Sequence, residues 1–222
     1  ACGGAPRPAA APAPAAPATG AQVLEAMHAR HGATWYRTLT FVQRTVQAPP
    51  TGGPERETTW YESMALPGRL RIDTDSTLRT GRLFANDSTY AVQRGRLVAA
   101  VPGYNALLVL GFDVYGQPVA RTAAALRALG FPDGPVRADT WEGRPAWVVG
   151  GAPGTAGDRR AAQYWIDRER LVFLRLIQPW PGDTTKAFEA RFLDYRPLAG
   201  GWIAPRVEAY VDGRRTLLEE YR

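Results

Sequence analysis

Apolar and polar residues alternate over most of this chain, which is the pattern of antiparallel β-strands with one buried face. The strand-like stretches cover residues 34–47, 57–66, 69–75, 81–87, 88–93, 96–101, 136–151, 164–178, 186–198 and 200–222. Short turns join several of them, at Pro67-Gly68, Arg94-Gly95, Glu142-Gly143 and Asp212-Gly213. Since Asp-Gly and similar pairs favour tight hairpins, we expect one large antiparallel sheet.

One hairpin departs from simple alternation. Residues 164–178 (YWIDRERLVFLRLIQ) predict two strands around a polar turn at 167–170. The second strand places Leu171, Phe173, Arg175 and Ile177 on one face and Val172, Leu174 and Leu176 on the other. An antiparallel strand with one solvent-exposed face would carry polar residues at every second position, and this strand carries almost none. We therefore expect one face to meet the interior of the sheet and the other to pack against neighbouring structure.

Helical periodicity interrupts the strands in three places. Residues 20–31 predict a helix that Thr19 caps and Gly32 ends. Residues 118–130 predict an amphipathic helix, and the apolar segment 104–118 lacks a period of two, which favours a helix or a buried lid. A large curved sheet has to cover its concave face, so these segments are the expected cover.

Composition limits the number of domains and the class of partner. The 222 residues are 45% hydrophobic and 22% charged, which suits a single folded domain over 21–222. No apolar run approaches the roughly 18 residues that span a bilayer. The net charge is +6 and the pI about 9.8, but the basic residues are scattered arginines, with Lys186 as the only lysine. This scatter favours a solvated basic surface over a nucleic-acid interface.

The first twenty residues differ from the rest of the chain. Cys2 is the only cysteine, so neither an internal disulfide nor a zinc site is expected. Its context, ACGG, resembles the lipidated cysteine of bacterial lipoproteins. The Pro- and Ala-rich residues 3–20 predict a disordered tether of roughly 55 Å. We expect a lipidated N-terminus followed by a linker; the other interpretation is an incidental cysteine in a disordered terminus.

Three short motifs occur in a characteristic order. They are Pro67-Gly68 with Arg69 and Arg71, then Trp165-Ile166-Asp167, then Gly201-Trp202 with Pro205. In this order the chain resembles, over residues 20–222, the LolA/LolB-like family of periplasmic lipoprotein-sorting proteins, which includes the RseB sensor domain. Residues 107–118 and 149–165 resemble a stand-alone LolA-like subgroup rather than the classical carrier. The resemblance implies an unclosed antiparallel β-barrel, mainly β with helices covering its concave face, and a cavity that holds acyl chains.

Candidate cavity residues come from the apolar positions of strands and of the helical cover. They are Leu39, Phe41, Trp60, Met64, Leu70, Ile72, Leu107, Leu110, Phe112, Leu126, Trp147, Trp165, Phe173 and Leu176. Each is also a plausible core residue, so the prediction concerns the set. An acyl chain needs a dry apolar channel and no catalytic group, so we expect no enzyme activity and no cofactor.

Residues with catalytic or metal-binding chemistry are sparse. Glu25, His28 and His31 have helical spacing, but they are joined by no further ligand cluster, which favours surface decoration over a metal site. No Gly-x-Ser-x-Gly stretch is present, which disfavours that hydrolase class. The carboxylate pairs Asp73/Asp75 and Glu219/Glu220 are interpreted as solvated strand ends.

These observations predict a lipid-anchored periplasmic protein that binds acyl chains non-covalently, in lipid or lipoprotein sorting or transfer to the outer membrane. Gly3 stands where an Asp would favour inner-membrane retention in the resembled family, so the outer membrane is favoured. We expect a monomer, attached to the membrane through Cys2. The alternative is an RseB-like sensor that reads lipid or lipoprotein and signals to a protein partner in the envelope.

Overall fold

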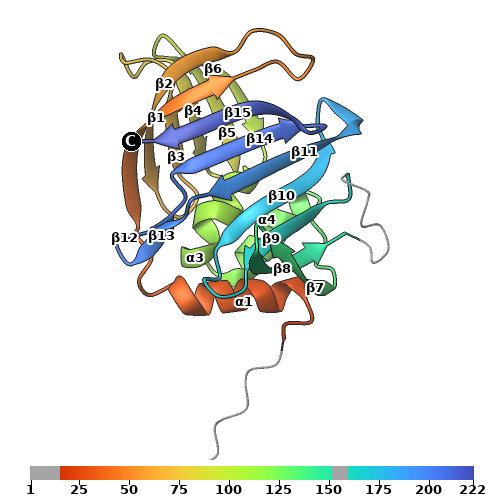
Figure 1. Cartoon of the computed structure of the whole chain (residues 1–222). Helices are drawn as coiled ribbons and strands as arrows, with labels where there is room; N and C mark the ends of the chain where they lie inside the picture. Colours follow the sequence, from red (N-terminus) through yellow and green to blue (C-terminus); the bar gives the residue numbers. More distant parts are fainter. Residues whose placement is uncertain (1–15, 152–159) are drawn as a thin grey trace, which may run out of the picture.

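A computed structural model describes residues 16–151 and 160–222. Its main feature is a 13-stranded antiparallel sheet in the order β6-β5-β4-β3-β2-β1-β15-β14-β11-β10-β9-β8-β7, with a separate two-stranded sheet of β12 and β13 (Figure 1). The strands are β1 (Thr38–Gln47), β2 (Arg56–Ala65), β3 (Leu70–Asp73), β4 (Gly81–Ala85), β5 (Ser88–Gln93), β6 (Arg96–Pro102), β7 (Val136–Trp141), β8 (Arg144–Gly150), β9 (Gln163–Asp167), β10 (Phe173–Trp180), β11 (Asp183–Leu193), β12 (Arg196–Leu198), β13 (Gly201–Ile203), β14 (Arg206–Val211) and β15 (Arg214–Tyr221).

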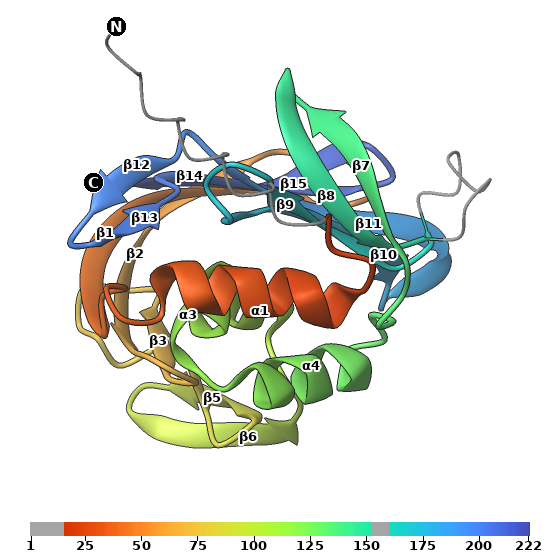
Figure 2. The same cartoon turned by 90° about the horizontal axis from the view of Figure 1, so that it is seen from below.

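The sheet is strongly curved, but it is not closed into a barrel. Strands β1 to β6 form one meander, and the pairing of β1 with the last strand, β15, joins this meander to the second half of the chain. Strands β6 and β7 remain as the two edges (Figures 1 and 2). The expected unclosed antiparallel barrel, mainly β with helices, is therefore confirmed.

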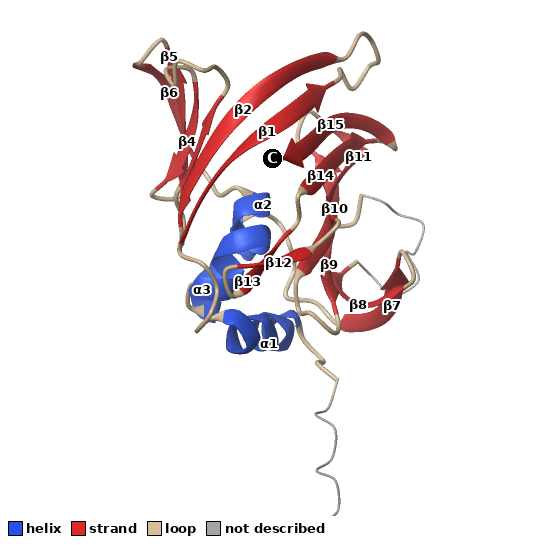
Figure 3. Ribbon diagram, turned by 60° about the vertical axis from the view of Figure 1, so that its left-hand side comes forward, coloured by secondary structure: helices blue, strands red, loops and turns tan. Residues whose placement is uncertain are grey.

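The helices lie on the concave side of the sheet, against one end of it (Figures 2 and 3). They are α1 (Gly20–His31), α2 (Ala106–Leu108), the π-helical turn η1 (Val109–Asp113), α3 (Val114–Gly116) and α4 (Val119–Ala128). The Thr19 side chain caps α1 by accepting a hydrogen bond from the backbone N–H of Gln22, and Gly32 follows the last turn, as predicted. Within the described ranges, no helix is both long and apolar enough to cross a membrane.

Contacts of helices α1 and α3 attach the helical cover to the sheet. Val23, Leu24 and Met27 of α1 are fully buried. The ring of Tyr115 in α3 stacks on Trp35 with 3.6 Å between ring centroids, and its hydroxyl accepts a hydrogen bond of 3.0 Å from the backbone N–H of Phe173. The sequence predicts that the first strand begins at Thr34, but the N–H groups of Thr34 and Trp35 donate to the carbonyl of His31, and the strand starts only at Thr38.

Strand β10 is buried on both faces, and a β-bulge changes which residues share a face. Phe173 pairs with Ile166 and Arg175 pairs with Trp165, with a register shift between them. Phe173 and Leu176 pack in the main core, whereas Leu174 packs in a second cluster on the convex face. The predicted alternation, which placed Phe173 and Arg175 together, is therefore wrong, because the bulge adds one residue to the strand.

Two tryptophans cover the convex face of β10. The Arg175 guanidinium lies over the ring of Trp141 at 4.0 Å and over that of Trp165 at 4.8 Å, and it pairs with Glu189 at 3.0 Å. The aliphatic part of an arginine side chain packs on apolar surface, and its planar guanidinium packs favourably against the faces of aromatic rings. Because both faces of β10 are covered by other residues, its sequence lacks the row of polar residues that a solvent-exposed face would carry.

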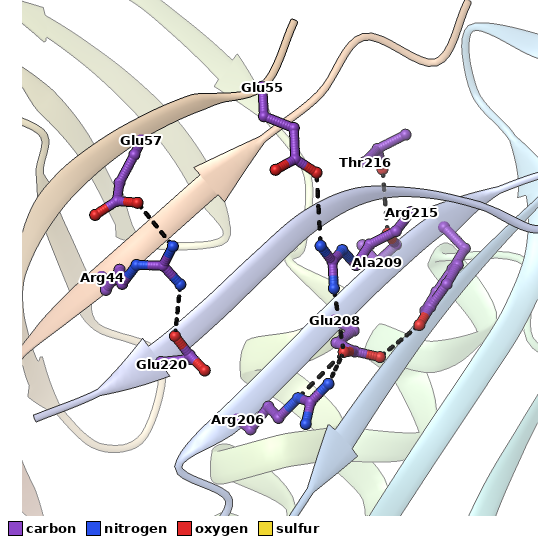
Figure 4. A network of polar contacts seen from close by, with 10 residues as sticks. Arg44, Glu55, Glu57, Arg206, Glu208, Ala209, Arg215, Thr216 and Glu220 are labelled. Atoms are coloured by element: carbon purple, nitrogen blue, oxygen red, sulfur yellow. Dashed lines mark hydrogen bonds and ion pairs between the residues drawn. The ribbon is translucent and has the colours of Figure 1, made fainter. Parts of the chain in front are cut away.

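Farther along the convex face, the sheet is polar. Arg44 pairs with Glu57 and Glu220 on the two neighbouring strands, each at 2.7 Å, and Glu208 lies between Arg206 and Arg215 (Figure 4). Each pair of opposite charges on adjacent strands stabilises a sheet by about 0.2–1 kcal/mol. This face of the central strands is therefore a solvated charged surface, and apolar residues concentrate on the concave side.

Candidate binding cavity

A cavity of about 860 Å³ lies between the concave face of the sheet and the α2–η1 part of the cover. Its wall is formed by Gln47, Pro50, Trp60, Glu62, Met64, Leu70, Ile72, Thr74, Arg82, Phe84, Asn105, Leu107, Leu108, Phe112, Trp180, Phe188, Phe192, Val207, Ala209, Thr216, Leu217, Glu219 and Tyr221. Most of these side chains are apolar, and they come from both halves of the sheet. The volume falls within the range of roughly 300–1,000 Å³ that is typical of ligand pockets.

The cover reaches the cavity through a capped helical turn. The Asn105 side chain accepts hydrogen bonds from the backbone N–H groups of Leu107 (2.9 Å) and Leu108 (3.2 Å), which fixes the start of α2. Both leucines line the cavity, and Phe112 follows from η1 with its ring centroid 5.9 Å from that of Phe192 on β11. The lid segment predicted from the sequence therefore supplies one wall.

Six of the predicted cavity residues line this cavity together. They are Trp60 and Met64 of β2, Leu70 and Ile72 of β3, and Leu107 and Phe112 of the cover. These residues share the period of two in the strands and the apolar face of the cover segment. Their role in binding a ligand stays a prediction.

The other predicted residues lie elsewhere. Leu110, Leu126, Phe173 and Leu176 are enclosed in the main core, and Leu39 and Phe41 pack against it, with the Phe41 ring 4.2 Å from that of Tyr221 on the cavity wall. Trp165 belongs to the convex-face cluster. Trp147 lines a separate groove of about 630 Å³ beside α1, where the Arg168 guanidinium lies 4.2 Å from its ring.

Sequence reasoning missed much of the wall that β11, β14 and β15 supply. Phe188 and Phe192 of β11 line the cavity, as do Val207 and Ala209 of β14. A signal for them existed, because residues 188, 190 and 192 alternate with charged residues. What the sequence lacked was the pairing of β1 with β15, which brings these strands opposite the cover.

Two carboxyl groups interrupt the apolar wall. Burial raises the pKa of Glu62 well above its ordinary value, and the nearby Glu219 adds to this shift. Burial also raises the pKa of Glu219, to about 7, although the side chain of Gln43 acts against the shift. The expectation that Glu219 and Glu220 form a solvated strand end is correct for Glu220, which pairs with Arg44, and wrong for Glu219, since alternation along β15 turns it inward.

The other carboxylate pair expected at a strand end also differs from the prediction. Asp73 is buried and accepts two hydrogen bonds from the Arg71 guanidinium, at 2.7 and 2.9 Å. Asp75 is half-buried and accepts hydrogen bonds from the backbone N–H and hydroxyl of Thr77. Asp73 is thus part of an ion pair, and Asp75 organises a turn.

The residues weighed as metal ligands on α1 do not converge. His31 is buried between the rings of Trp35 and Tyr115, and its Nε2–H donates to the carbonyl of Arg170 at 2.8 Å. Burial lowers the pKa of this imidazole. Across residues 16–151 and 160–222, no group of three or more His, Cys, Asp and Glu side chains is placed to hold a metal ion.

Comparisons with known proteins extend this description. No family model matches the sequence, and no curated protein matches it. A LolA superfamily protein from Nitrosomonas europaea has a similar structure, with a TM-score of 0.53 and 8% identity over 90% of this chain and 91% of that one. This chain has the LolA-like fold.

Two further structures show the same LolA-like architecture. A putative outer membrane lipoprotein-sorting protein domain from Vibrio parahaemolyticus has a TM-score of 0.56 and 10% identity over 91% of this chain and 89% of that one. A DUF1329 family protein from Desulfovibrio piger also has a TM-score of 0.56 and 10% identity, over 91% of this chain and 90% of that one. At these identities the similarity establishes the LolA-like fold.

Proposed function

We propose that this protein binds the acyl chains of lipids or lipoproteins non-covalently in the cavity beneath the α2–η1 cover, and acts in their sorting or transfer. The observation that carries the proposal is the cavity itself, about 860 Å³ of mostly apolar wall under a helical cover. The LolA-like fold supports it, because one protein with a similar structure is named as a lipoprotein-sorting domain.

The energetics favour a carrier over an enzyme. Each buried methylene contributes about 0.8 kcal/mol, so a sixteen-carbon chain gains on the order of 12 kcal/mol against water. A bilayer offers nearly the same gain, so cargo passes between cavity and membrane at little net cost. Such a function needs no catalytic group, and we propose that the protein is not an enzyme.

The proposed location is the periplasm, with an anchor in the outer membrane through a lipidated Cys2. Cys2 lies outside the described residues, so this part rests on the ACGG sequence and on the Pro- and Ala-rich stretch that follows. In a bacterial host that expresses the full precursor, an alkyne analogue of palmitate should label the protein, and Cys2→Ala should abolish the label. Labelling that persists in Cys2→Ala would remove the anchor from the proposal.

A second candidate, an RseB-like sensor with a protein partner, has one observation in its favour. Edge strand β6 exposes Leu97 (63%), Val98 (52%) and Val101 (60%), and exposed apolar residues on an open edge often mark protein contacts. A sensor should change its affinity for a second protein when loaded, whereas a carrier should deliver its cargo to acceptor vesicles. Measuring both for the acyl-loaded full chain separates the two functions.

The binding step is tested with the full chain and a fluorescent sixteen-carbon fatty acyl probe. Leu107→Asp places a carboxylate on the cavity wall, where loss of hydration is costly, so probe affinity should fall at least about tenfold. Leu97→Asp on exposed β6 is the matched control and should bind as the wild type does. No saturable binding by the wild type, or equal binding by both variants, would contradict the proposal.

A further inference from the structure

One buried carboxyl group on the cavity wall lacks a hydrogen-bond or ion-pair partner among the residues that the structure describes. Glu62 of β2 is only 5% exposed, and it lines the cavity. None of the hydrogen bonds or ion pairs among the described residues involves its carboxyl oxygens. Burying an acidic group without a partner costs free energy, so its retention in an apolar wall suggests that a ligand group satisfies it.

The sheet register places two further acceptors, Gln43 and Glu219, on the same face of the sheet as Glu62. Strand β1 lies between β2 and β15, with Phe41 opposite Glu62 and Thr45 opposite Glu219. Gln43 lies between these two positions on the same face of β1, so the two carboxyl groups flank it diagonally. Gln43 is fully buried; its Nε2 donates to the Thr45 hydroxyl at 3.2 Å, and its Oε1 has no partner within residues 16–151 and 160–222.

The basic side chain on the described cavity wall is not paired with these carboxyl groups. Among the described wall residues, Arg82 of β4 is the basic side chain; the register Glu62–Ile72–Arg82 places it two strands from Glu62, as Glu219 is, but it forms no ion pair with either carboxyl group. Arg44, the nearest arginine on β1, is engaged with Glu57 and Glu220 on the opposite face of the sheet. The cluster thus has acceptors in excess and lacks a cationic donor.

An ammonium group matches this deficit. It offers three N–H donors and no acceptor, and its charge offsets the repulsion between two carboxylates. A fatty acid would instead bring a third acidic group to the pair. We therefore propose that the ligand is a long-chain amphiphile with a primary ammonium group, which binds at Glu62, with Glu219 adding negative charge on the same wall, while its hydrocarbon chain lies along the apolar wall; this rests on the acyl-binding function proposed above.

The titration of the pair supports the same ligand. Burial and mutual proximity raise the pKa of Glu62, and burial raises that of Glu219 to about 7. An ammonium ligand favours the deprotonated pair, so its binding releases protons and strengthens as pH rises through 7. Arg82 and the Tyr221 phenol are the other titratable groups on the wall.

The test compares three amphiphiles with the same chain: dodecylamine, dodecanol and dodecanoate. Each competes with the fluorescent acyl probe for the full chain at pH 8 and pH 6. At pH 8, dodecylamine should displace the probe at a concentration about tenfold lower than dodecanol, because its hydrogen bonds are charge-assisted, and dodecanoate should be the weakest. The advantage of the amine should shrink at pH 6. Equal displacement by amine and alcohol, or stronger displacement by dodecanoate, overturns the inference.

Two variants test whether the preference for the amine depends on the carboxyl groups of Glu62 and Glu219. The double variant Glu62→Gln/Glu219→Gln should lose the preference for the amine and still bind dodecanol, while Glu220→Gln, on the opposite face of the same strand, should keep the preference. If all three amphiphiles bind the wild type without preference, this inference fails and the acyl-binding function stands. If none binds, the proposed function itself fails. The comparison on the wild type decides the question even if the double variant does not fold.

Discussion

The carboxylate of Asp113 accepts a hydrogen bond of 2.7 Å from the backbone N–H of Gly68. Asp113 ends η1 of the cover, and Gly68 belongs to the turn between β2 and β3, two strands that line the cavity. Gly68 has a φ of +80°, a conformation in which glycine is strongly preferred. The cover is thus fastened to the sheet through a group that titrates.

Acidification should favour the closed position of the cover, in which the Asp113 carboxyl is buried. Burial raises the pKa of Asp113 to about 6, although the Gly68 N–H and Arg121 act against the shift and Asp87 adds to it. When the cover opens, the carboxyl returns toward its ordinary pKa of 3.8, so the closed form binds the proton more tightly. Lowering the pH from 7 to 5 should therefore favour closure by roughly 1 kcal/mol.

Hydrogen exchange of residues 106–116, corrected for intrinsic rates, measures this closure. Protection should increase from pH 7 to pH 5 in the wild type and stay flat in Asp113→Asn, whose amide does not titrate. The comparison isolates Asp113 from neighbouring groups, since Asp87 and Arg121 are unchanged in the variant. Protection that decreases on acidification in the wild type would refute the fastening.

A methyl group at Gly111 should both destabilise the protein and narrow the cavity. A Cβ there would lie 2.5 Å from the ring of Phe192, which lines the cavity and packs on Phe173 at 5.0 Å between centroids. Displacing that ring outweighs the better helix propensity of alanine, so Gly111→Ala should cost about 1–2 kcal/mol and weaken acyl-probe binding. Gly134→Ala, where the nearest atom is 3.5 Å away, is the control in urea unfolding. Equal stability of the two variants would contradict the expected clash.

The hydroxyl of Tyr115 should matter for stability because it satisfies a buried backbone group. Tyr115→Phe keeps the stack on Trp35 but leaves the N–H of Phe173 without its acceptor. We expect a loss of about 1–3 kcal/mol in the free energy of unfolding. Tyr104→Phe, which removes an exposed contact to Asp87, should change stability by less than about 0.5 kcal/mol. Similar values for the two variants would show that the buried bond contributes little.

Local sequence signals predicted the elements well. The helix at residues 20–31 follows from Thr19, from Gly32 and from apolar positions one turn apart, and these interactions lie within a few residues. The hairpin at Asp212-Gly213 likewise depends on local turn geometry. The bulge between Phe173 and Arg175 was not predicted, because it depends on pairing with β9 and on the convex-face tryptophans.

The cavity was predicted only in part, for the same reason. Residues of β2, β3 and the cover were found because their apolar faces can be read directly from the sequence. Phe192 and Glu219 were missed because their position depends on strand pairing between the two ends of the chain. Leu110 was assigned to the cavity although it is fully buried beneath it, since a lid and a core segment share one apolar pattern.

Asp167 organises the turn before β10 by accepting hydrogen bonds from a side chain and from the backbone of the turn. Its carboxylate is 1% exposed and accepts hydrogen bonds from Arg144 (2.7 Å) and from the backbone N–H groups of Glu169 (2.9 Å) and Arg170 (2.8 Å). Burial alone would raise the pKa of Asp167, but these donors outweigh it and the pKa is lowered. The ionised form therefore stabilises the fold above the unfolded pKa of about 3.9, and this contribution is lost as pH falls through the lowered native value.

Asp167→Asn should accordingly cost about 2–4 kcal/mol at pH 7, since a neutral amide leaves Arg144 without its buried counterion and places an N–H₂ group among donors. Urea unfolding at pH 7 and pH 3 measures the difference, which should shrink at pH 3, where the unfolded wild-type chain binds a proton at this carboxyl and the ionised native form loses part of its advantage. Asp139→Asn, at an exposed position of β7, should be neutral at both values. A deficit that is the same at pH 7 and pH 3 would mean that shape, not charge, makes Asp167 important to this turn.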